Sequence, residues 1–149
     1  MKFLTTEEFF GPSVNAVKTG MSLDDEKQRK QECIRFISQL NALQYKDTRC
    51  ECIAISIFSL YARKVPFSHF ERFMAATMAY YIAAKINYKK PEIHFYEQYV
   101  HERAPMMNQV PFEGQIREQM HKVAVELELN MLAVLQYDFE FEYPFTYVK

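Results

Sequence analysis

The chain has 149 residues, 49% hydrophobic and 15% aromatic, and its 18 basic and 19 acidic side chains leave a net charge of −1. This length suits one domain with ample apolar content for a packed core, and the balanced charge argues against nucleic acid or an anionic membrane as partner. The longest apolar stretch falls short of the roughly 20 residues of a membrane-spanning helix, and the start is acidic too early for a secretory signal, so we expect a soluble intracellular protein.

The first predicted element is a helix over residues 22–43. Only three glycines and six prolines, with almost no alternation of apolar and polar residues, predict an all-α domain. Ser22 is the expected N-cap, and acidic residues follow it in the first turn. The first half is charged, so only the second half should pack deeply. The inward-facing positions are expected to be Cys33, Ile34, Ile37 and Leu40.

A second helix is predicted after Asp47 and Thr48, and it extends through residues 50–64. Its expected inner face consists of Ile53, Ile57, Leu60 and Tyr61. The sequence Val-Pro-Phe at residues 65–67 then breaks the chain. Ser68 is expected to open the third helix in a capping box, in which Ser68 and Glu71 satisfy each other's free backbone amides.

The third helix is predicted to lie at the centre of the domain. It carries no charge from Met74 to Ala84, and a helix that is apolar on every side is normally surrounded by other elements. Small side chains that recur along it should let neighbouring helices approach closely. They are Ala75, Ala76, Ala79, Ala83 and Ala84.

Two further helices complete the prediction. The fourth restarts after Pro91, with Ile93, Tyr96 and Val100 facing inward. The fifth spans residues 110–137, and its apolar stripe consists of Ile116, Met120, Val123, Leu127, Met131 and Val134. After this helix the chain leaves the bundle, and Pro144 suits the first turn of another helix.

Lys85 and Glu128 are the two candidate site residues. Lys85 ends the apolar third helix, and Glu128 lies among aliphatic residues of the fifth, where a carboxylate is costly without a partner. Periodicity alone favours a structural role, in which the aliphatic part of the Lys85 side chain packs along the edge of the core. Glu128 would then be a carboxylate at this edge or would pair with Lys85. The alternative is that both side chains are held ready for backbone groups of a partner.

Other residue patterns indicate no enzyme, metal or cofactor. Cys33, Cys50 and Cys52 lack zinc-finger spacing and are expected to be reduced, structural thiols. The histidines contain no metal-binding motif, and solvent-facing or capping roles are expected for them. They are His69, His94, His101 and His121. Lys89 and Lys90 are expected in a solvated turn.

Three segments together resemble the cyclin box, a five-helix module, and most closely that of the transcription-associated cyclins T, K, L and C. Residues 3–37 are similar to the start of cyclins T and K, with an aromatic residue and a T-x-E before Pro-Ser, then a glycine and an acidic stretch. Residues 53–85 resemble the second helix, an F-x-x-F turn and the Ala-rich third helix. Residues 128–148 resemble the family's E-x-x-LLxxLxFdlxvxxPyxyl. Their order and spacing make the resemblance specific.

This resemblance implies a role for both candidate residues. In the family, the lysine that closes the third helix and a glutamate of the fifth form an anchor pair that hydrogen-bonds a kinase near its αC helix. Lys85 matches the lysine and Glu128 matches the glutamate, whereas Glu126 is out of register. The implied function is a nuclear regulatory subunit, itself not an enzyme, that binds and activates a cyclin-dependent kinase of the transcription-associated class.

The chain also departs from the family pattern. Asn87, Tyr88, Lys89 and Lys90 stand where the family has two acidic residues, so kinase choice is altered or kinase binding is lost. The alternative function is a cyclin-fold adaptor in a multiprotein complex without kinase activation. We expect an N-terminal entry segment over residues 1–21, the cyclin box over 22–142, and in 143–149 either the start of a missing second repeat or a C-terminal tail.

Overall fold

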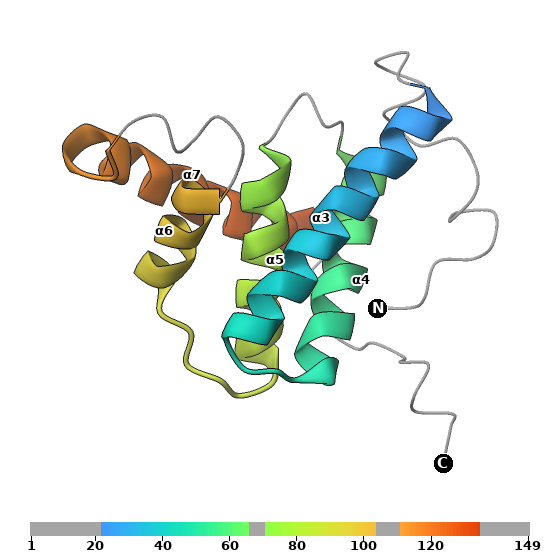
Figure 1. The fold of residues 1–149 in the computed structure, drawn as a ribbon, viewed down its shortest axis with the longest axis horizontal. Helices are drawn as coiled ribbons and strands as arrows, with labels where there is room; N and C mark the ends of the chain where they lie inside the picture. Colours follow the sequence, from blue (N-terminus) through green and yellow to red (C-terminus); the bar gives the residue numbers. More distant parts are fainter. Residues whose placement is uncertain (1–21, 66–70, 104–110, 135–149) are drawn as a thin grey trace.

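A computed structural model describes residues 22–65, 71–103 and 111–134 (Figure 1). Regular structure in these ranges is entirely helical, as predicted for an all-α chain. The helices are α3 (Leu23–Leu43), α4 (Thr48–Lys64), α5 (Arg72–Ile86), α6 (Ile93–Arg103) and α7 (Gly114–Val134). Within the described ranges, none of these helices is long and apolar enough to cross a membrane.

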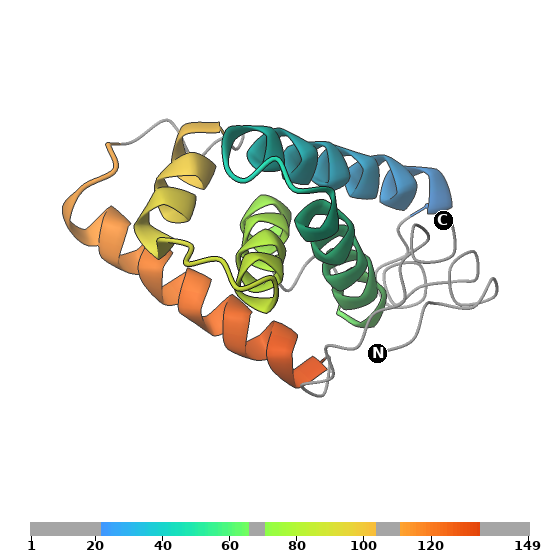
Figure 2. The ribbon, with the colours of Figure 1, turned by 90° about the horizontal axis from the view of Figure 1, so that it is seen from below.

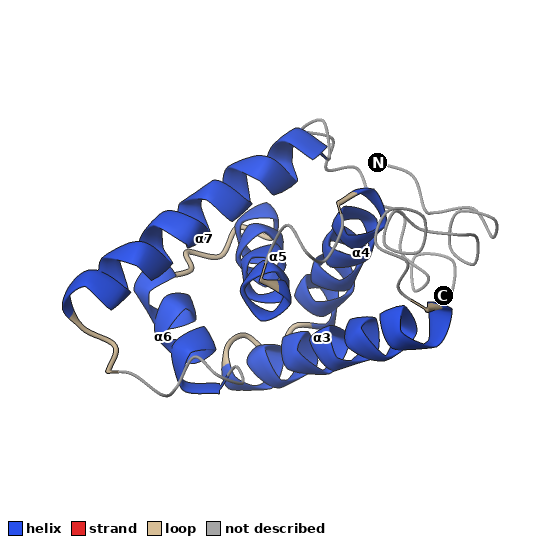
Figure 3. Cartoon of the chain, turned by 90° about the horizontal axis from the view of Figure 1, so that it is seen from above, coloured by secondary structure: helices blue, strands red, loops and turns tan. Residues whose placement is uncertain are grey.

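Helix α5 lies at the centre of the bundle. Figures 2 and 3 show it with α3, α4, α6 and α7 arranged around it, and it contacts each of these four helices. Every residue from Phe73 to Ala84 is buried, so the helix presents no face to solvent over three turns. The prediction of a central third helix is therefore confirmed.

Small and large side chains of α5 have different roles in packing. Ala75, Ala79 and Ala83 are fully buried, which indicates close approach of the surrounding helices. Met78 and Tyr80 are also fully buried and supply bulk on other sides of the helix. Burial of each large apolar side chain contributes about 1.5–3 kcal/mol, so α5 anchors the core around it.

Helices α3 and α4 begin where the sequence predicted. The Ser22 hydroxyl accepts a hydrogen bond from the backbone amide of Asp25 at 3.1 Å, and the Asp47 carboxylate accepts one from the amide of Arg49 at 2.9 Å. The first half of α3 is mostly exposed, although Glu26 is buried and lies 3.6 Å from Lys30. The second half of α3 supplies the buried residues Cys33, Phe36, Ile37 and Leu40.

The start of α5 differs from the prediction. The N-cap is Glu71, whose own carboxylate accepts a hydrogen bond from the backbone amide of Met74 at 2.5 Å. This one side chain satisfies an amide of the first turn, so the helix begins at Arg72 and not directly after Ser68. The predicted capping box is therefore wrong, because the N-cap is Glu71 and not Ser68. Ser68 itself lies outside the described residues.

Some predicted inward faces are also corrected. Val123 is 40% exposed, and the neighbouring Ala124 is buried in its place, because the buried face of α7 runs through Ala124, Leu127 and Met131. On α3, Ile34 is only partly buried, whereas the partly buried Leu60 of α4 packs against the core as predicted. The buried positions Tyr96 and Val100 on α6 agree with the prediction. Pro144 and the segment 1–21 lie outside the described residues.

A polar network joins α3 to α4 and α5. The Asn41 side-chain carbonyl accepts hydrogen bonds from the Tyr80 hydroxyl at 2.7 Å and from the backbone amide of Asp47 at 3.1 Å. The Asn41 amide nitrogen donates to Glu51 at 3.4 Å, and Ser38 donates to the other oxygen of Glu51 at 2.5 Å. Buried polar groups need such partners, so the network fixes the turn between α3 and α4 against the central helix.

Candidate functional site

Lys85 and Glu128 meet at the rim of the bundle. Lys85 lies in the last turn of α5, and Glu128 lies on α7, 43 residues further along the chain. The Lys85 ammonium nitrogen donates a hydrogen bond to the Glu128 Oε1 at 2.6 Å. The Lys85 side chain is 46% exposed and that of Glu128 is 18% exposed. The structure therefore forms the pair and leaves it accessible from solvent.

Tyr81, one turn before Lys85, forms the third side of this site. The Lys85 ammonium nitrogen lies 4.3 Å from the centroid of the Tyr81 ring, within the range of a cation–π interaction. Partial burial alone would lower the pKa of Lys85, but the hydrogen bond and charge of Glu128, together with Tyr81, outweigh it and raise that pKa above its usual value. Lys85 is therefore a fixed positive charge at neutral pH.

The Lys85–Glu128 pair contributes little to stability. An ion pair with this much exposure typically stabilises a fold by about 0.2–1 kcal/mol, because water screens it and two long side chains lose freedom. An ammonium has three donors and a carboxylate accepts several hydrogen bonds, whereas one mutual bond joins these two groups. The Lys85 ammonium and the Glu128 carboxylate can thus form further hydrogen bonds with groups of another molecule.

The chain turns sharply directly after Lys85. The backbone amide of Lys89 donates to the carbonyl of Ala84 at 2.9 Å, and the amide of Tyr88 donates to the carbonyl of Lys85 at 3.1 Å. These two bonds form a Schellman motif, in which the residue at the position of Tyr88 adopts a left-handed conformation. Tyr88 has φ of 61°, where glycine is usual and a bulky side chain is strained.

The strained Tyr88 side chain extends into solvent. It is 95% exposed and lines a hollow of about 410 Å³ with the N-terminal end of α4. The other residues lining this hollow are Asp47, Arg49, Ile86 and Asn87. An exposed aromatic ring, a shallow hollow and the Lys85–Glu128 pair thus lie around the same end of α5.

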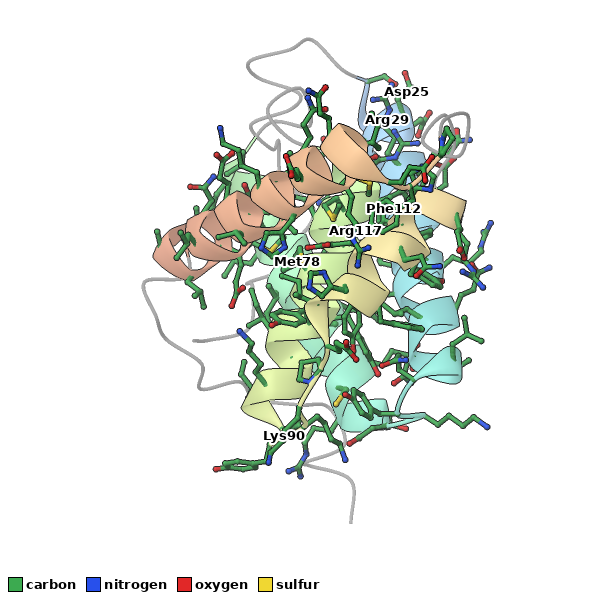
Figure 4. The ribbon with its side chains drawn as sticks, turned by 90° about the vertical axis from the view of Figure 1, so that its left-hand side faces the viewer. Asp25, Arg29, Met78, Lys90, Phe112 and Arg117 are labelled. Carbon is green, nitrogen blue, oxygen red and sulfur yellow. The ribbon has the colours of Figure 1, made fainter. Side chains whose placement is uncertain are left out.

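The two lysines of this edge have different environments. The Lys89 ammonium lies 3.9 Å from the Asp47 carboxylate and 5.6 Å from the centroid of the Tyr45 ring, while its side chain is 38% exposed directly after the turn that ends α5, as expected for a solvated turn. Lys90 is exposed. Figure 4 shows Lys90 at the end of the bundle away from Phe112 and Arg117. Both lysines are therefore accessible to solvent, and Lys90 is the more exposed of the two.

Sequence reasoning missed a second cluster, between α6 and α7. His94 and Glu97 are three residues apart on α6, and His121 of α7 lies against the same carboxylate. The spacing of His94 and Glu97 was a signal in the sequence, but no spacing places His121 beside them.

The exposure of the histidines agrees only in part with the prediction. The rings of His94 and His121 are about half exposed, as expected. His101 is instead buried, with its ring centroid 5.1 Å from that of Phe112, so the expected solvent-facing role is wrong for His101.

The three cysteines are free thiols. Cys33 and Cys50 are fully buried, and Cys52 is partly buried. Burial raises the pKa of Cys33 to about 12 and that of Cys50 to about 11. Both thiols are therefore protonated at neutral pH and behave as small apolar groups of the core, as the sequence predicted.

No family model matches the chain, and no curated protein matches it. The geometry of Lys85, Glu128 and Tyr88, together with the sequence resemblance, therefore carries the argument for a function.

Proposed function

We propose that this chain is a cyclin-like regulatory subunit that binds and activates a cyclin-dependent kinase, of the transcription-associated class, in the nucleus. The observation that carries the proposal is the accessible Lys85–Glu128 pair, formed between α5 and α7 with a separation of 2.6 Å. In this proposal residues 22–142 form a single cyclin box. The proposal rests on the resemblance for its partner and on this pair for its binding face.

The rigidity of α5 supports a docking role for Lys85. Twelve consecutive residues before Lys85 are buried, so the backbone that carries the ammonium is held by the core on all sides. Binding groups that are already positioned lose less freedom on association, which leaves more of the interaction energy for affinity. Glu128 fixes the ammonium further, and each residue satisfies the other until a partner's backbone groups arrive.

The proposed mechanism requires no chemistry by this chain. Active kinases need the αC helix and the activation loop held in one arrangement. A subunit that binds that arrangement better than the inactive one shifts the population towards it by its difference in affinity. The Lys85–Glu128 face would supply this difference by hydrogen bonds to the kinase beside αC.

The edge formed by Asn87 to Lys90 accounts for selectivity in this proposal. Tyr88 offers an exposed ring and Lys90 a positive charge at the position where the cyclins that the chain resembles carry acidic residues. Aromatic residues are frequent hot spots of protein interfaces, and charge complementarity chooses between partners. The preferred kinase would therefore carry an acidic group opposite this edge.

The direct test is purification of the tagged chain from nuclear extract, identification of co-purifying kinases, and a kinase assay with the recovered partner and recombinant chain. The proposal expects a cyclin-dependent kinase whose activity rises when the chain is added. Absence of any such kinase, or a bound kinase that is not stimulated, would overturn it.

A second candidate is a cyclin-fold adaptor, and the Tyr88 edge is the observation that favours it. The edge lacks the acidic residues of the cyclins that the chain resembles, and its exposed, strained aromatic ring can bind a protein partner of another class. Recovery of a non-kinase partner whose binding depends on Tyr88, with no kinase stimulated, would support the adaptor.

A further inference from the structure

Glu97 is a buried carboxylate at the interface of α6 and α7. Its side chain is 0% exposed, and its two oxygens contact two histidines. Oε2 lies 3.3 Å from His94 Nδ1, and Oε1 lies 2.5 Å from His121 Nδ1. A buried negative charge is costly unless a positive charge or a metal ion compensates it, and an ion held by these same three side chains would supply that charge.

The three side chains converge on one point at the protein surface. One ligand atom from each of His94, Glu97 and His121 lies within 4.8 Å of the other two. The two rings have centroids 5.7 Å apart and are each about half exposed, so solvent reaches the cluster from the side of the rings. His94 and Glu97 share one face of α6, and α7 contributes the third group.

We propose that His94, Glu97 and His121 form a binding site for a divalent transition-metal ion, for which zinc is the best fit. Two imidazoles and one carboxylate are a known ligand set for zinc, whereas magnesium and calcium prefer oxygen ligands alone. The ion would neutralise Glu97 and join α6 to α7. This inference is independent of the kinase proposal.

The geometry requires a modest adjustment on binding. Zinc–ligand bonds of about 2.0–2.2 Å place tetrahedral ligand atoms about 3.3 Å apart, compared with the present limit of 4.8 Å. Rotation of the half-exposed histidine rings about their side-chain bonds supplies this movement without displacing buried Glu97. An imidazole that coordinates through Nδ1 carries its proton on Nε2, so the two histidine–carboxylate contacts are exchanged for three metal–ligand bonds.

The fourth coordination position faces solvent. With three protein ligands, a tetrahedral ion keeps one position for water or for a group from another molecule. His121 lies seven residues before Glu128, so the two residues lie on the same side of α7. A bound ion would therefore hold that side of α7 against α6.

The test uses the full chain, freed of metal with a chelator and titrated with zinc chloride by calorimetry and by thermal unfolding. We expect one ion per chain and a melting temperature that rises with zinc concentration. Mutation of a residue that hydrogen-bonds to a metal ligand typically lowers metal affinity about 10–100-fold. The variants His94→Ala and His121→Ala remove a ligand itself, so each should weaken zinc binding by about 100-fold or more. Glu102→Gln, an exposed carboxylate of α6, is the matched control and should bind like the unaltered chain.

Cobalt distinguishes this site from the cysteines. Cobalt bound by nitrogen and oxygen should give visible absorption bands of a four-coordinate ion without the thiolate charge-transfer band in the near ultraviolet. Unchanged zinc affinity in His94→Ala, a thiolate band, or no binding of one ion per chain would overturn the proposal. Because His94 is half exposed, His94→Ala should fold even if Glu97→Gln does not.

Discussion

The ammonium of Lys85 lies 2.6 Å from the carboxylate of Glu128, and so joins the end of the central helix α5 to α7. Lys85 continues a helix whose preceding twelve residues are buried, yet its own side chain is 46% exposed. The pair therefore lies where the buried helix α5 reaches the protein surface. Because the charges are accessible, they contribute little to the stability of the fold.

Removal of the pair should leave the fold intact. For Lys85→Ala, we expect the free energy of unfolding in urea to change by about 2 kcal/mol or less, since exposed ion pairs contribute about 0.2–1 kcal/mol. The Tyr81 contact adds about 0.5–1 kcal/mol at an exposed site, which sets the upper end of that range. A loss of several kcal/mol would show that Lys85 is a structural residue.

Tyr88→Gly should stabilise the protein. Tyr88 has φ of 61°, and an L-residue in the left-handed region costs about 1–2 kcal/mol that glycine avoids. Part of this gain is lost because glycine is more flexible when unfolded, so we expect a net gain of about 0.5–1 kcal/mol in urea unfolding. Tyr88→Ala is the matched control: it removes the ring but keeps the strain. If both variants destabilise the chain equally, the ring packs on the fold and the account of this turn is wrong.

Enlargement of a small residue on α5 should be costly. Ala79 is fully buried between helices, and Ala79→Leu introduces three carbon atoms where close packing leaves no room. We expect a loss of about 1–3 kcal/mol or more in chemical denaturation. Ala133→Leu, the same change at an exposed position of α7, should alter stability by about 0.5 kcal/mol or less. Equal effects at both positions would contradict the central placement of α5.

The three thiols should react with iodoacetamide in a defined order. The pKa of Cys33 is raised from 9.0 to about 12, which reduces its thiolate fraction at pH 8 by about 1,000-fold, and its side chain is fully buried. Cys50 has a pKa raised to about 11 and is also buried, whereas Cys52 is partly exposed. Mass spectrometry of the folded chain should find Cys52 modified first, with Cys33 and Cys50 modified only after denaturation. Early modification of Cys33 would place it outside the core.

The helices could be predicted from sequence because their signals are local. Ser22 and Asp47 cap their own helices, and the uncharged run from Met74 to Ala84 by itself requires burial on every side. The start of α5 was missed because serine is a favoured N-cap and glutamate is not, and only the structure shows that the Glu71 carboxylate accepts a hydrogen bond from the amide of Met74. Val123 was misplaced because a one-residue rotation of a helix face is below what periodicity resolves.

The sites were less predictable because they combine distant segments. Lys85 and Glu128 could be named, since charges within apolar runs stand out, but their separation of 2.6 Å depends on how α7 crosses α5. Tyr88 gave no signal, because the left-handed position that it occupies favours glycine. The meeting of His121 with Glu97 likewise depends on the packing of α6 against α7.

The measurement that tests the central claim most directly is the affinity of the chain for its proposed partner, a cyclin-dependent kinase that co-purifies with it, compared between the unaltered chain and the variants Lys85→Glu and Glu128→Ala. Glu126→Ala is the matched control, since Glu126 is an exposed carboxylate two residues away on α7. Truncating one partner of a close charge pair at an interface costs about 2–5 kcal/mol, so each site variant should bind at least about 30-fold more weakly, while Glu126→Ala binds normally. Equal affinity of all four proteins would contradict the proposal that the kinase docks on Lys85 and Glu128.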